Sequence, residues 1–323
     1  MLLRRLIHDY ILPVRIISEE PMVFPCGISR SGTTLLATVL DAHSKICLGY
    51  ELLPPPLAGV ETVLGKLRDG MTLAHNDFAR AGSHLRKGGD KDIGQWLSRC
   101  HRAGTTAEDV EEVLKTLIGQ GRTGLTTMEE RLRLCTMVVQ KPQKRNGSLL
   151  SGFKYSGHRF DDRIAAFPNA SFIYILRDPR DIIVSMRERE FDRTLSQICG
   201  DWNRHLHSFE TFLARHPKQA AMIRYEDLVS QPIETIGNFF SVLPVNPEPA
   251  VYEFQNSTAT VLNSRHPNTE NLKKGFFTDS IGRWRTQLQA PDVAAIEREC
   301  QRDMPRHGYD LSSTNHKPMT TAT

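Results

Sequence analysis

The 323-residue sequence has no apolar run long enough to cross a membrane and no strong excess of either charge. A membrane-spanning helix needs about 20 consecutive apolar residues, so the pattern argues against one. The 41 basic and 37 acidic residues leave a net charge of only +4, which does not indicate a nucleic-acid partner. Hydrophobic residues at 39% and charged residues at 24% exclude a disordered chain and a collagen-like repeat, and are typical of a globular protein.

Cysteine is also scarce, and its positions fit neither a metal site nor a disulfide scaffold. The six cysteines form no CxxC pair, and their spacing matches no zinc pattern: Cys26, Cys47, Cys100, Cys135, Cys199 and Cys300. In a chain of this length such cysteines are typically buried free thiols, which predicts a reducing compartment and a cytoplasmic location. No Asp-rich cluster suggests a magnesium site, so we expect no metal.

Both ends of the chain lack the patterns of targeting or folded segments. Charged residues such as Arg4, Arg5 and Asp9 interrupt the apolar stretches of residues 1–20, unlike the core of a signal peptide. We expect an amphipathic segment that packs on the domain, with peripheral membrane contact through Arg4, Arg5 and the nearby leucines as the alternative. Residues 311–323 are polar and aperiodic, which predicts a flexible tail.

Between these ends, short β-rich runs alternate with helical patterns. Five runs predict strands, at residues 22–28, 45–50, 152–155, 171–176 and 221–225. The fourth run, SFIYIL, is apolar almost throughout, as in strands buried on both faces of a parallel sheet. Helical patterns between the strands favour right-handed βαβ crossovers. We therefore expect an α/β fold with a single domain at 21–310, including a mostly helical insertion at 58–150.

The most informative motif is the loop between the first predicted strand and the helix after it. It reads Gly27-Ile28-Ser29-Arg30-Ser31-Gly32-Thr33-Thr34. Backbone N–H groups at such a turn point outward together and, with the helix dipole, form an anion site. The G-x-x-x-x-G outline matches a Walker A loop, but Thr33 stands where that motif has lysine, and Arg30 supplies positive charge instead. An ordinary Gly/Ser turn before a core helix is the alternative.

This loop resembles the 5′-phosphosulfate loop of sulfotransferases, which use 3′-phosphoadenosine-5′-phosphosulfate (PAPS) and release 3′-phosphoadenosine-5′-phosphate (PAP). The run LDAHSKICLGYE resembles the protein-tyrosine sulfotransferase branch, whose members have a glycine before an acidic pair. Here Tyr50 stands at the first acidic position, and Glu51 keeps the second. The resemblance implies the sulfotransferase fold, a P-loop-like parallel β-sheet flanked by helices. It also implies a set of donor-binding loop residues: Arg30, Ser31, Gly32, Thr33 and Thr34.

A second motif, ILRDPRDIIVSM, implies another part of the nucleotide site. The resemblance assigns Arg177, at the end of a predicted strand, and Ser185, on the following helix, to the nucleotide 3′-phosphate. Ser185 and Arg189 have i, i+4 spacing, which places both on one face of that helix. The alternative, a helix capped by Asp178 with Pro179 in its first turn, is compatible with this role.

Two later segments resemble further parts of the same site. In IRYEDLVSQP, the counterpart of a tyrosine near the nucleotide is Tyr225, with packing at a strand end as the alternative. In DSIGRWRTQL, the implied cofactor-binding residues are Ser280, Arg283 and Trp284. The alternative for this segment is a surface helix that begins after Asp279 and anchors Trp284 in the core.

Sulfuryl transfer to a hydroxyl needs a base for the hydroxyl proton and donors for the sulfonate and leaving oxygens. Glu51 is the leading base, because it follows the second predicted strand, near the edge where ligands gather in α/β sheets. The resemblance also places the family's catalytic acidic residue here and a bridging lysine at Lys154, and Arg30 completes the catalytic set. His158 is a competing base. His43 lies on the apolar face of the first helix, where a core histidine is typical.

The predicted function is transfer of the sulfuryl group of PAPS to a hydroxyl-bearing acceptor, with the 58–150 insertion on the acceptor side. The resemblance implies tyrosine in an acidic peptide or protein as that acceptor. Tyr50 departs from the branch pattern, and no cysteine lies beside Lys154 or directly before Gly49, as in the disulfide arrangement of the Golgi enzymes. A carbohydrate, lipid or small-molecule hydroxyl therefore stays an alternative. The other function classes are a P-loop kinase or NTPase and an inactive nucleotide-binding protein, and a homodimer is compatible with the sequence.

Overall fold

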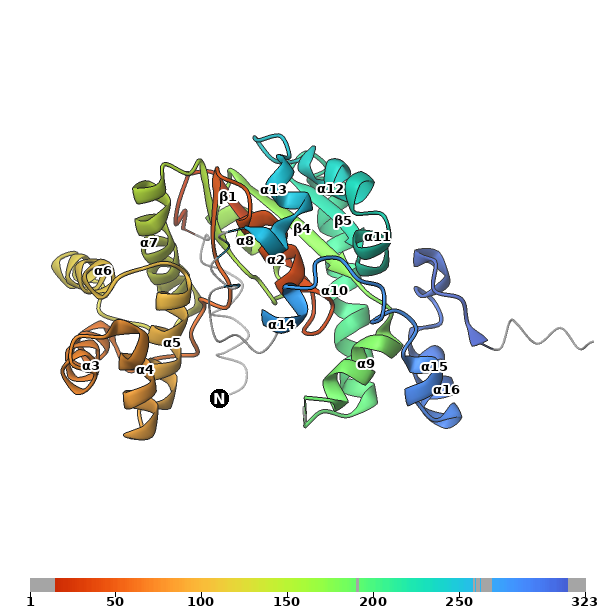
Figure 1. The fold of residues 1–323 in the computed structure, drawn as a ribbon, viewed down its shortest axis with the longest axis horizontal. Coiled ribbons are helices and arrows are strands. Elements are labelled where there is room, and N and C mark those ends of the chain that lie inside the picture. Colours follow the sequence, from red (N-terminus) through yellow and green to blue (C-terminus); the bar gives the residue numbers. More distant parts are fainter. Residues whose placement is uncertain (1–14, 190–191, 258, 260–261, 263–268, 313–323) are drawn as a thin grey trace, which may run out of the picture.

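A parallel β-sheet lies at the centre of the chain. The computed structural model describes residues 15–189, 192–257, 259, 262 and 269–312. Within them, five parallel strands form one sheet in the order β2-β3-β1-β4-β5 (Figure 1). The strands are β1 (Met22–Cys26), β2 (Ile46–Gly49), β3 (Leu150–Phe153), β4 (Ala170–Leu176) and β5 (Ala220–Arg224). The α/β class and all five predicted strands are confirmed, with small differences at the strand ends.

Helices cover both faces of the sheet and form a further group at its β2 edge. Outside the insertion they are α2 (Thr33–Asp41), α8 (Phe160–Ala166), α9 (Pro179–Arg187), α10 (Leu195–Arg215), α11 (Tyr225–Ser230), α12 (Pro232–Phe240), α13 (Pro249–Tyr252), α14 (Thr269–Leu272), α15 (Trp284–Gln287) and α16 (Ala290–Cys300), with 3₁₀ turns at Phe254–Asn256 and Pro305–His307. Within it are α3 (Val60–Leu73), α4 (Phe78–Lys87), α5 (Lys91–Arg102), α6 (Ala107–Gly119) and α7 (Met128–Asn146). The helical character predicted for 58–150 is thus confirmed.

Both faces of the sheet are buried, as expected for a parallel sheet between helices. Side chains alternate along each strand, so Val23 packs with Leu36 of α2 on one face. On the other face Tyr174 stacks on Phe209 of α10, with ring centroids 4.7 Å apart. All of these side chains are inaccessible to solvent. The sheet is therefore a rigid base, and its strand ends hold the side chains that follow them in fixed positions.

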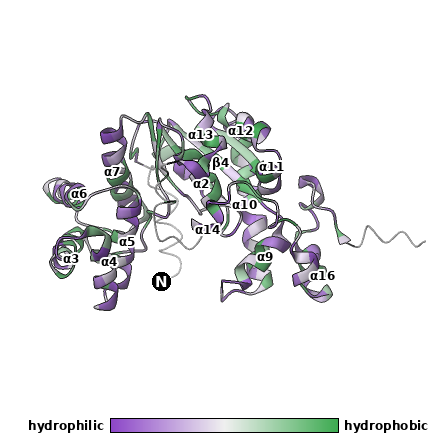
Figure 2. Ribbon diagram, in the orientation of Figure 1, coloured by the Kyte–Doolittle hydropathy of each residue, from purple (hydrophilic) through white to green (hydrophobic). Residues whose placement is uncertain are grey.

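The insertion helices pack through apolar faces and turn polar faces outward (Figure 2). In α5 the buried positions include Trp96, Leu97 and Cys100. The closest approach is between α4 and α5, where a Cβ atom on Gly82 would lie 2.3 Å from the carbonyl oxygen of Gly94. This contact requires glycine and fixes the position of α5, which also packs against β2.

A buried ion-pair cluster fixes the start of α9. The Asp178 carboxylate accepts a hydrogen bond from the backbone N–H of Arg180, and Pro179 is the first residue of the helix. The Arg180 guanidinium also pairs with Asp178 at 2.8 Å and with Glu297 of α16 at 2.6 Å. The predicted cap of this helix is confirmed, and the cluster anchors the element that carries Ser185.

Predictions for the ends and the cysteines have mixed outcomes. Residues 1–14 and 313–323 lie outside the described residues, so the amphipathic segment and the tail stay predictions. Within the described residues 15–20, the backbone N–H of Ile17 donates a hydrogen bond to the Ala166 carbonyl. All six cysteines are buried and form no disulfide, as predicted. Along the described chain, no helix combines the length and apolar character needed to cross a membrane.

Candidate active site

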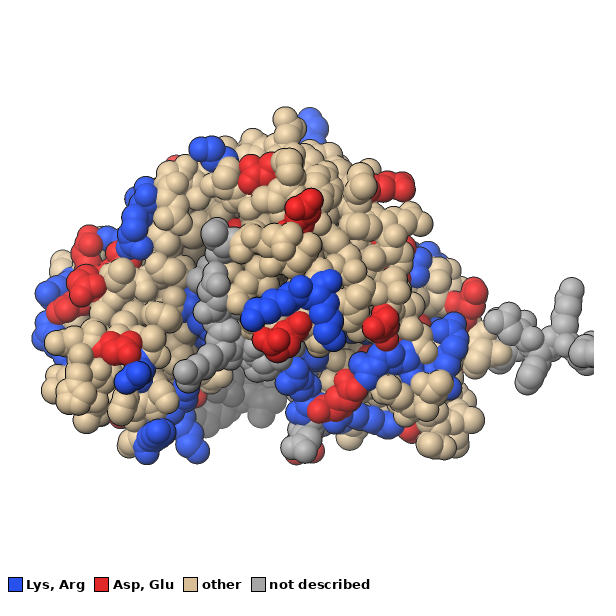
Figure 3. Space-filling model, viewed as in Figure 1, with Lys and Arg blue, Asp and Glu red and all other residues tan. Residues whose placement is uncertain are grey.

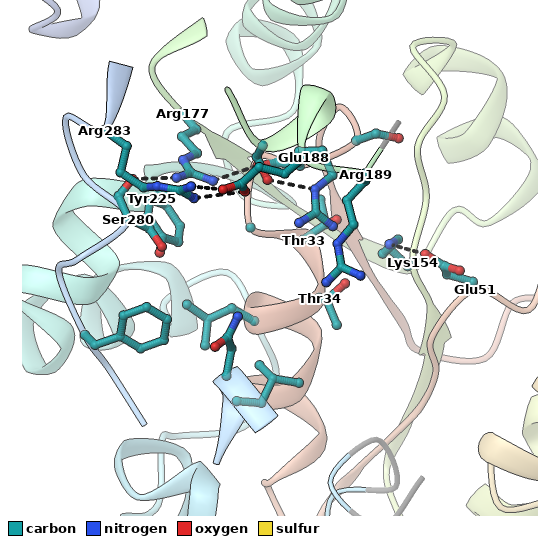
Figure 4. Close-up of a pocket in the computed structure, with 18 of the residues that line it drawn as sticks. Thr33, Thr34, Glu51, Lys154, Arg177, Glu188, Arg189, Tyr225, Ser280 and Arg283 are labelled. Carbon is teal, nitrogen blue, oxygen red and sulfur yellow. Dashed lines mark hydrogen bonds and ion pairs between the residues drawn. The ribbon is translucent and has the colours of Figure 1, made fainter. Parts of the chain in front are cut away.

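All five strands deliver a side chain to one cavity of about 580 Å³ at their carboxyl ends (Figure 4). The loop after β1 carries Arg30, Glu51 follows β2, and Lys154 follows β3. Arg177 follows β4, and Tyr225 follows β5. Carboxyl ends of parallel strands are where ligands bind in open α/β sheets. Most of the predicted site residues, distant in sequence, therefore share one pocket.

The loop after β1 presents an open helix N-terminus to this pocket. Gly27 and Gly32 have φ of 148° and 105°, and Arg30 has φ of 71°, a left-handed conformation that only glycine adopts easily. Among the described residues no side chain caps the first turn of α2, and Thr33 and Thr34 line the cavity. The free backbone N–H groups of that turn, with the helix dipole, favour an anion.

Ser31 does not contribute its hydroxyl to the pocket. It is 1% exposed, and both its hydroxyl and its backbone N–H donate to the Ile28 carbonyl, which closes the loop. Ser29, which the motif analysis did not single out, lines the cavity instead. The side chain of Ser31 thus has a structural position, unlike the direct donor contact that we predicted.

Hydrogen bonds join the two predicted halves of the nucleotide site. The Arg30 Nε donates to the Ser185 hydroxyl at 2.9 Å, linking the loop to α9. Arg177 donates to the carbonyl oxygens of Arg30 at 3.0 Å and Ser280 at 2.6 Å, and its guanidinium lies 4.4 Å from the centre of the Tyr225 ring. Arg177 is thus partly a structural clamp.

Burial lowers the pKa of Arg30, and the charges of Arg189 and Arg177 lower it further.

The end of α9 differs from the prediction. The helix stops at Arg187, so Ser185 and Arg189 do not share one helical face, although both line the cavity. Glu188 caps the helix and turns into the pocket, where it pairs with Arg283. The sequence analysis did not predict Glu188 as a pocket residue. The surrounding residues all favour helix, so nothing in the pattern indicates that the chain turns into the pocket there.

Glu51 and Lys154 form an ion pair at the other end of the cavity. The Lys154 ammonium lies 2.8 Å from one Glu51 oxygen, and Arg99 of α5 lies 3.7 Å from the other. The lysine side chain is only 11% exposed, whereas that of Glu51 is 39% exposed. The carboxylate is therefore both held in position and open to a ligand. The Glu51 carboxylate is thus the counter-ion of the buried Lys154 amine.

Three predicted or competing residues lie outside the pocket lining. Trp284 is buried, with its ring 3.8 Å from the Arg180 guanidinium, which fits the alternative of a core anchor. His43 stacks on Phe240 and contacts the Asn246 carbonyl at 2.8 Å, as a core histidine does. His158 faces His205, with ring centroids 5.3 Å apart, and does not line the cavity.

Positive charge exceeds negative charge in the pocket. The lining includes two carboxylates, Glu51 and Glu188, and six cations: Arg30, Arg102, Lys154, Arg177, Arg189 and Arg283. Lysine and arginine side chains also gather on the surface near α5 and near α9 (Figure 3). Such an excess favours a ligand with several negative charges. Arg102 and Gln95 come from α5 in the insertion, where no motif pointed to them.

Comparisons with known proteins bear on this geometry. A family model described as the sulfotransferase family matches residues 21–245. Among curated proteins, the chain is similar to protein-tyrosine sulfotransferase 1 of Danio rerio, with 22% identity over 90% of this chain and 73% of the relative. It is also similar to the protein-tyrosine sulfotransferase of Drosophila melanogaster, with 25% identity over 93% of this chain. The match covers 52% of that relative, so the chain spans about half its length.

Two solved structures share the fold. The sulfotransferase domain of the Synechococcus PCC 7002 olefin synthase aligns with a TM-score of 0.60 and 20% identity over 91% of this chain and 96% of that domain. The sulfotransferase domain from the curacin biosynthetic pathway aligns with a TM-score of 0.51 and 19% identity over 90% of this chain and 99% of that domain. At these identities the likeness concerns the fold.

Proposed function

The chain belongs to the sulfotransferase family, and we propose that it transfers the sulfuryl group of PAPS to a hydroxyl acceptor. The observation that carries this proposal is the convergence of five strand ends on one cationic pocket that also holds the carboxylate of Glu51. A module that only binds a phosphorylated nucleotide needs the cations, whereas transfer from a hydroxyl also needs a proton acceptor. Glu51 supplies that group.

The pocket residues fit the donor because their positive charge is not balanced within the pocket. The first turn of α2, Arg30, Thr33 and Thr34 would hold the 5′-phosphosulfate through backbone N–H groups, hydroxyls and one guanidinium. Gly32 allows the backbone to approach these oxygens closely. The loop has no lysine like that of a Walker A motif, which disfavours the P-loop kinase alternative.

The 3′-phosphate would lie at the other side of the loop. Ser185 and Arg189 line that region, and Arg283 enters it from the segment before α15. Arg177 would act mainly by holding Arg30 and Ser280 in place, because its hydrogen bonds already join them. Tyr225 and Ser280 complete the lining on this side.

The chain's own residues account for the transfer step. When bound, PAPS supplies a sulfuryl group already attached to a phosphate leaving group. Glu51 accepts the proton of the acceptor hydroxyl while that oxygen bonds to sulfur and the bond between sulfur and the phosphate oxygen breaks. Lys154, next to Glu51, and Arg30, in the loop, stabilise the negative charge on the sulfonate and leaving oxygens. No metal has a part in this scheme.

For the acceptor we propose a tyrosine hydroxyl in a peptide or protein. The support is the similarity to protein-tyrosine sulfotransferases over 90% of this chain or more. The insertion would lie on the acceptor side, because Gln95 and Arg102 of α5 line the cavity near Glu51. Carbohydrate, lipid and small-molecule hydroxyls remain the alternatives to test. The cytoplasmic location, the dimer and the absence of a nucleic-acid partner stay predictions.

Two experiments test this function. In thermal-shift assays, PAP should raise the melting temperature at micromolar concentrations, and ATP with magnesium should not; the reverse result would indicate a kinase or NTPase. Incubation with PAPS and a panel of tyrosine peptides, sugars, lipids and phenols, followed by mass spectrometry, should yield a product heavier by one sulfuryl group. Binding of PAP without transfer to any acceptor would favour an inactive nucleotide-binding protein.

A further inference from the structure

Asp181 is a buried carboxylate that takes no part in the proposed transfer step. It lies in the first turn of α9 and is 1% exposed. One carboxylate oxygen accepts a hydrogen bond from the backbone N–H of Gly282 at 2.7 Å, and the other accepts one from the backbone N–H of Trp284 at 3.0 Å. Both N–H groups belong to the segment 280–284, in which Ser280 and Arg283 line the pocket.

The stability of the core alone does not require a charge at this position. Burying a carboxylate costs free energy unless hydrogen bonds replace its contacts with water. Burial raises the pKa of Asp181, and the hydrogen bonds from Trp284 and Gly282 offset only part of that rise. An apolar side chain of similar size would avoid the cost. What the carboxylate supplies is a pair of acceptors that hold two backbone N–H groups at once.

The segment that Asp181 holds has no cap of its own. Arg283 is the N-cap residue of α15, and its side chain makes no capping hydrogen bond. Gly282, just before it, has φ of 72°, a left-handed conformation that suits glycine. The free N–H groups at the start of a helix need acceptors, and Asp181 supplies them from α9, against which α15 packs.

Asp181 and Arg177 hold the same segment from one motif. Arg177, four residues before Asp181, donates to the Ser280 carbonyl at 2.6 Å. Two side chains near the start of α9 thus fix three backbone groups of the segment. Arg283 lies between the two fixed N–H groups and lines the pocket, as does Ser185 of α9 (Figure 4). Asp181 therefore sets how the two sides of this region face each other.

We infer that Asp181 is a positioning residue for the nucleotide 3′-phosphate, because its grip on the backbone of Gly282 and Trp284 keeps Arg283 directed into the pocket. This inference rests on the proposed function, which assigns the 3′-phosphate to the region between Ser185 and Arg283. Asp181 does not line the cavity, so it acts through the segment and not by contact with the nucleotide. Without its two hydrogen bonds, nucleotide binding would also have to order Arg283, which weakens affinity.

The experiment measures the binding of PAP and AMP, which differ only in the 3′-phosphate, by calorimetry. Asp181→Asn keeps the size of the side chain but replaces one acceptor with an amide donor, which then faces a backbone N–H group. This variant should bind PAP about tenfold more weakly than the wild type, as for the loss of one charge-assisted hydrogen bond, and AMP less than about twofold more weakly. Asp181→Ser, which keeps one oxygen acceptor, serves the same test if Asp181→Asn does not fold.

Asp109→Asn is the matched control. The Asp109 carboxylate also accepts a hydrogen bond from a backbone N–H group, that of Thr106 at 2.9 Å, but it belongs to the capping box of α6 outside the pocket. This variant should lose stability and keep the wild-type ratio of PAP affinity to AMP affinity. Urea unfolding of both variants separates a general loss of stability from a specific loss of 3′-phosphate binding.

A double-mutant cycle identifies the residue through which Asp181 acts. Arg283→Gln alone should also lower PAP affinity. When Arg283→Gln is already present, adding Asp181→Asn should lower PAP affinity by less than about threefold, because the side chain that Asp181 positions is already gone.

The outcomes separate the inference from the proposed function. Equal losses of PAP and AMP affinity in Asp181→Asn, an unchanged PAP affinity, or full additivity with Arg283→Gln would overturn the positioning role and leave the sulfotransferase function intact. A wild-type protein that binds PAP no more tightly than AMP would instead overturn the proposed donor site, and the inference with it.

Discussion

The Glu188 carboxylate is hydrogen-bonded to the Arg283 guanidinium inside the pocket, with 3.1 Å between Oε2 and Nη1. This pair joins the end of α9 to the segment before α15 (Figure 4). The charge of Glu188 also acts on Arg30. A protein carboxylate thus occupies the region that we assign to the nucleotide 3′-phosphate. It partly neutralises that region before a ligand binds and repels the phosphate.

Removing this charge should strengthen nucleotide binding. We expect Glu188→Gln to raise the affinity for PAP by about two- to fivefold, a modest change because the Glu188 side chain is half-exposed and its charge is screened. The affinity for AMP, which lacks the 3′-phosphate, should change less. Calorimetry with both nucleotides measures this difference. Asp292→Asn is the matched control, since Asp292 pairs with Arg187 outside the pocket; weaker PAP binding in Glu188→Gln would contradict the assignment.

A second prediction concerns the base. Glu51→Gln keeps the shape of the side chain but cannot accept a proton, so turnover should fall by about 10²–10⁴-fold. PAP affinity should stay near the wild-type value, because Glu51 lies at the acceptor end of the cavity. Glu61→Gln, an exposed position on α3, should leave turnover unchanged. Near-normal turnover in Glu51→Gln would exclude it as the base, and His158 could not replace it without moving into the pocket.

Arg177 and Ser185 are both predicted from the sequence to hold the 3′-phosphate, but their contacts in the structure differ. Ser185→Ala removes only the hydroxyl that contacts Arg30, so it should reduce the preference for PAP over AMP without lowering the melting temperature. Arg177→Ala breaks two hydrogen bonds from a side chain that is 6% exposed, so it should also destabilise the fold by about 2 kcal/mol or more. Calorimetry and urea unfolding measure the two effects. Equal stability in both variants would contradict the clamp role of Arg177.

Contiguous motifs made much of the site predictable. Arg30, Glu51 and Arg177 each follow a strand within a short, distinctive run, and the parallel sheet brings such strand ends together. Arg102 had no such signal, because it lies in an amphipathic helix of the insertion that resembles any surface helix. Its place in the pocket lining depends on where α5 packs. The close contact between α4 and α5 determines that packing, and single-residue patterns do not.

The end of α9 was mispredicted for a related reason. The run from Arg187 to Arg189 consists of good helix formers, so local propensity favours a longer helix. The helix nevertheless ends at Arg187, and the residues at its end make tertiary ion pairs that local propensity does not include: Arg187 pairs with Asp292, and Glu188 pairs with Arg283. Likewise, the hydroxyl direction of Ser31 follows from the loop backbone, which the motif alone does not determine.

A pH prediction follows from the contact between His158 and His205. Burial, reinforced by the charge of His158, lowers the pKa of His205 to about 4 from an ordinary value of 6.5. The unfolded chain therefore binds a proton that the folded protein excludes, and stability is lost as pH falls from about 6.5 towards 4. In His205→Gln, the loss of unfolding free energy between pH 7 and pH 5 should be smaller by up to about 2 kcal/mol. Urea unfolding at both pH values tests this, and identical losses would contradict it.

The last prediction isolates the contact between the phosphate loop and Tyr225. Gly32 has φ of 105°, and a Cβ atom there would lie 2.6 Å from the Tyr225 ring. Gly32→Ala should therefore displace either the ring or the first turn of α2, and lower PAP affinity at least tenfold. Gly89→Ala is the matched control, because Gly89 has φ of 100° but open space around its Cβ position. It carries the same backbone strain without the clash, so it should reduce stability slightly and leave PAP binding unchanged. If both variants bind PAP like the wild type, the close fit of Tyr225 against the loop does not support the nucleotide site.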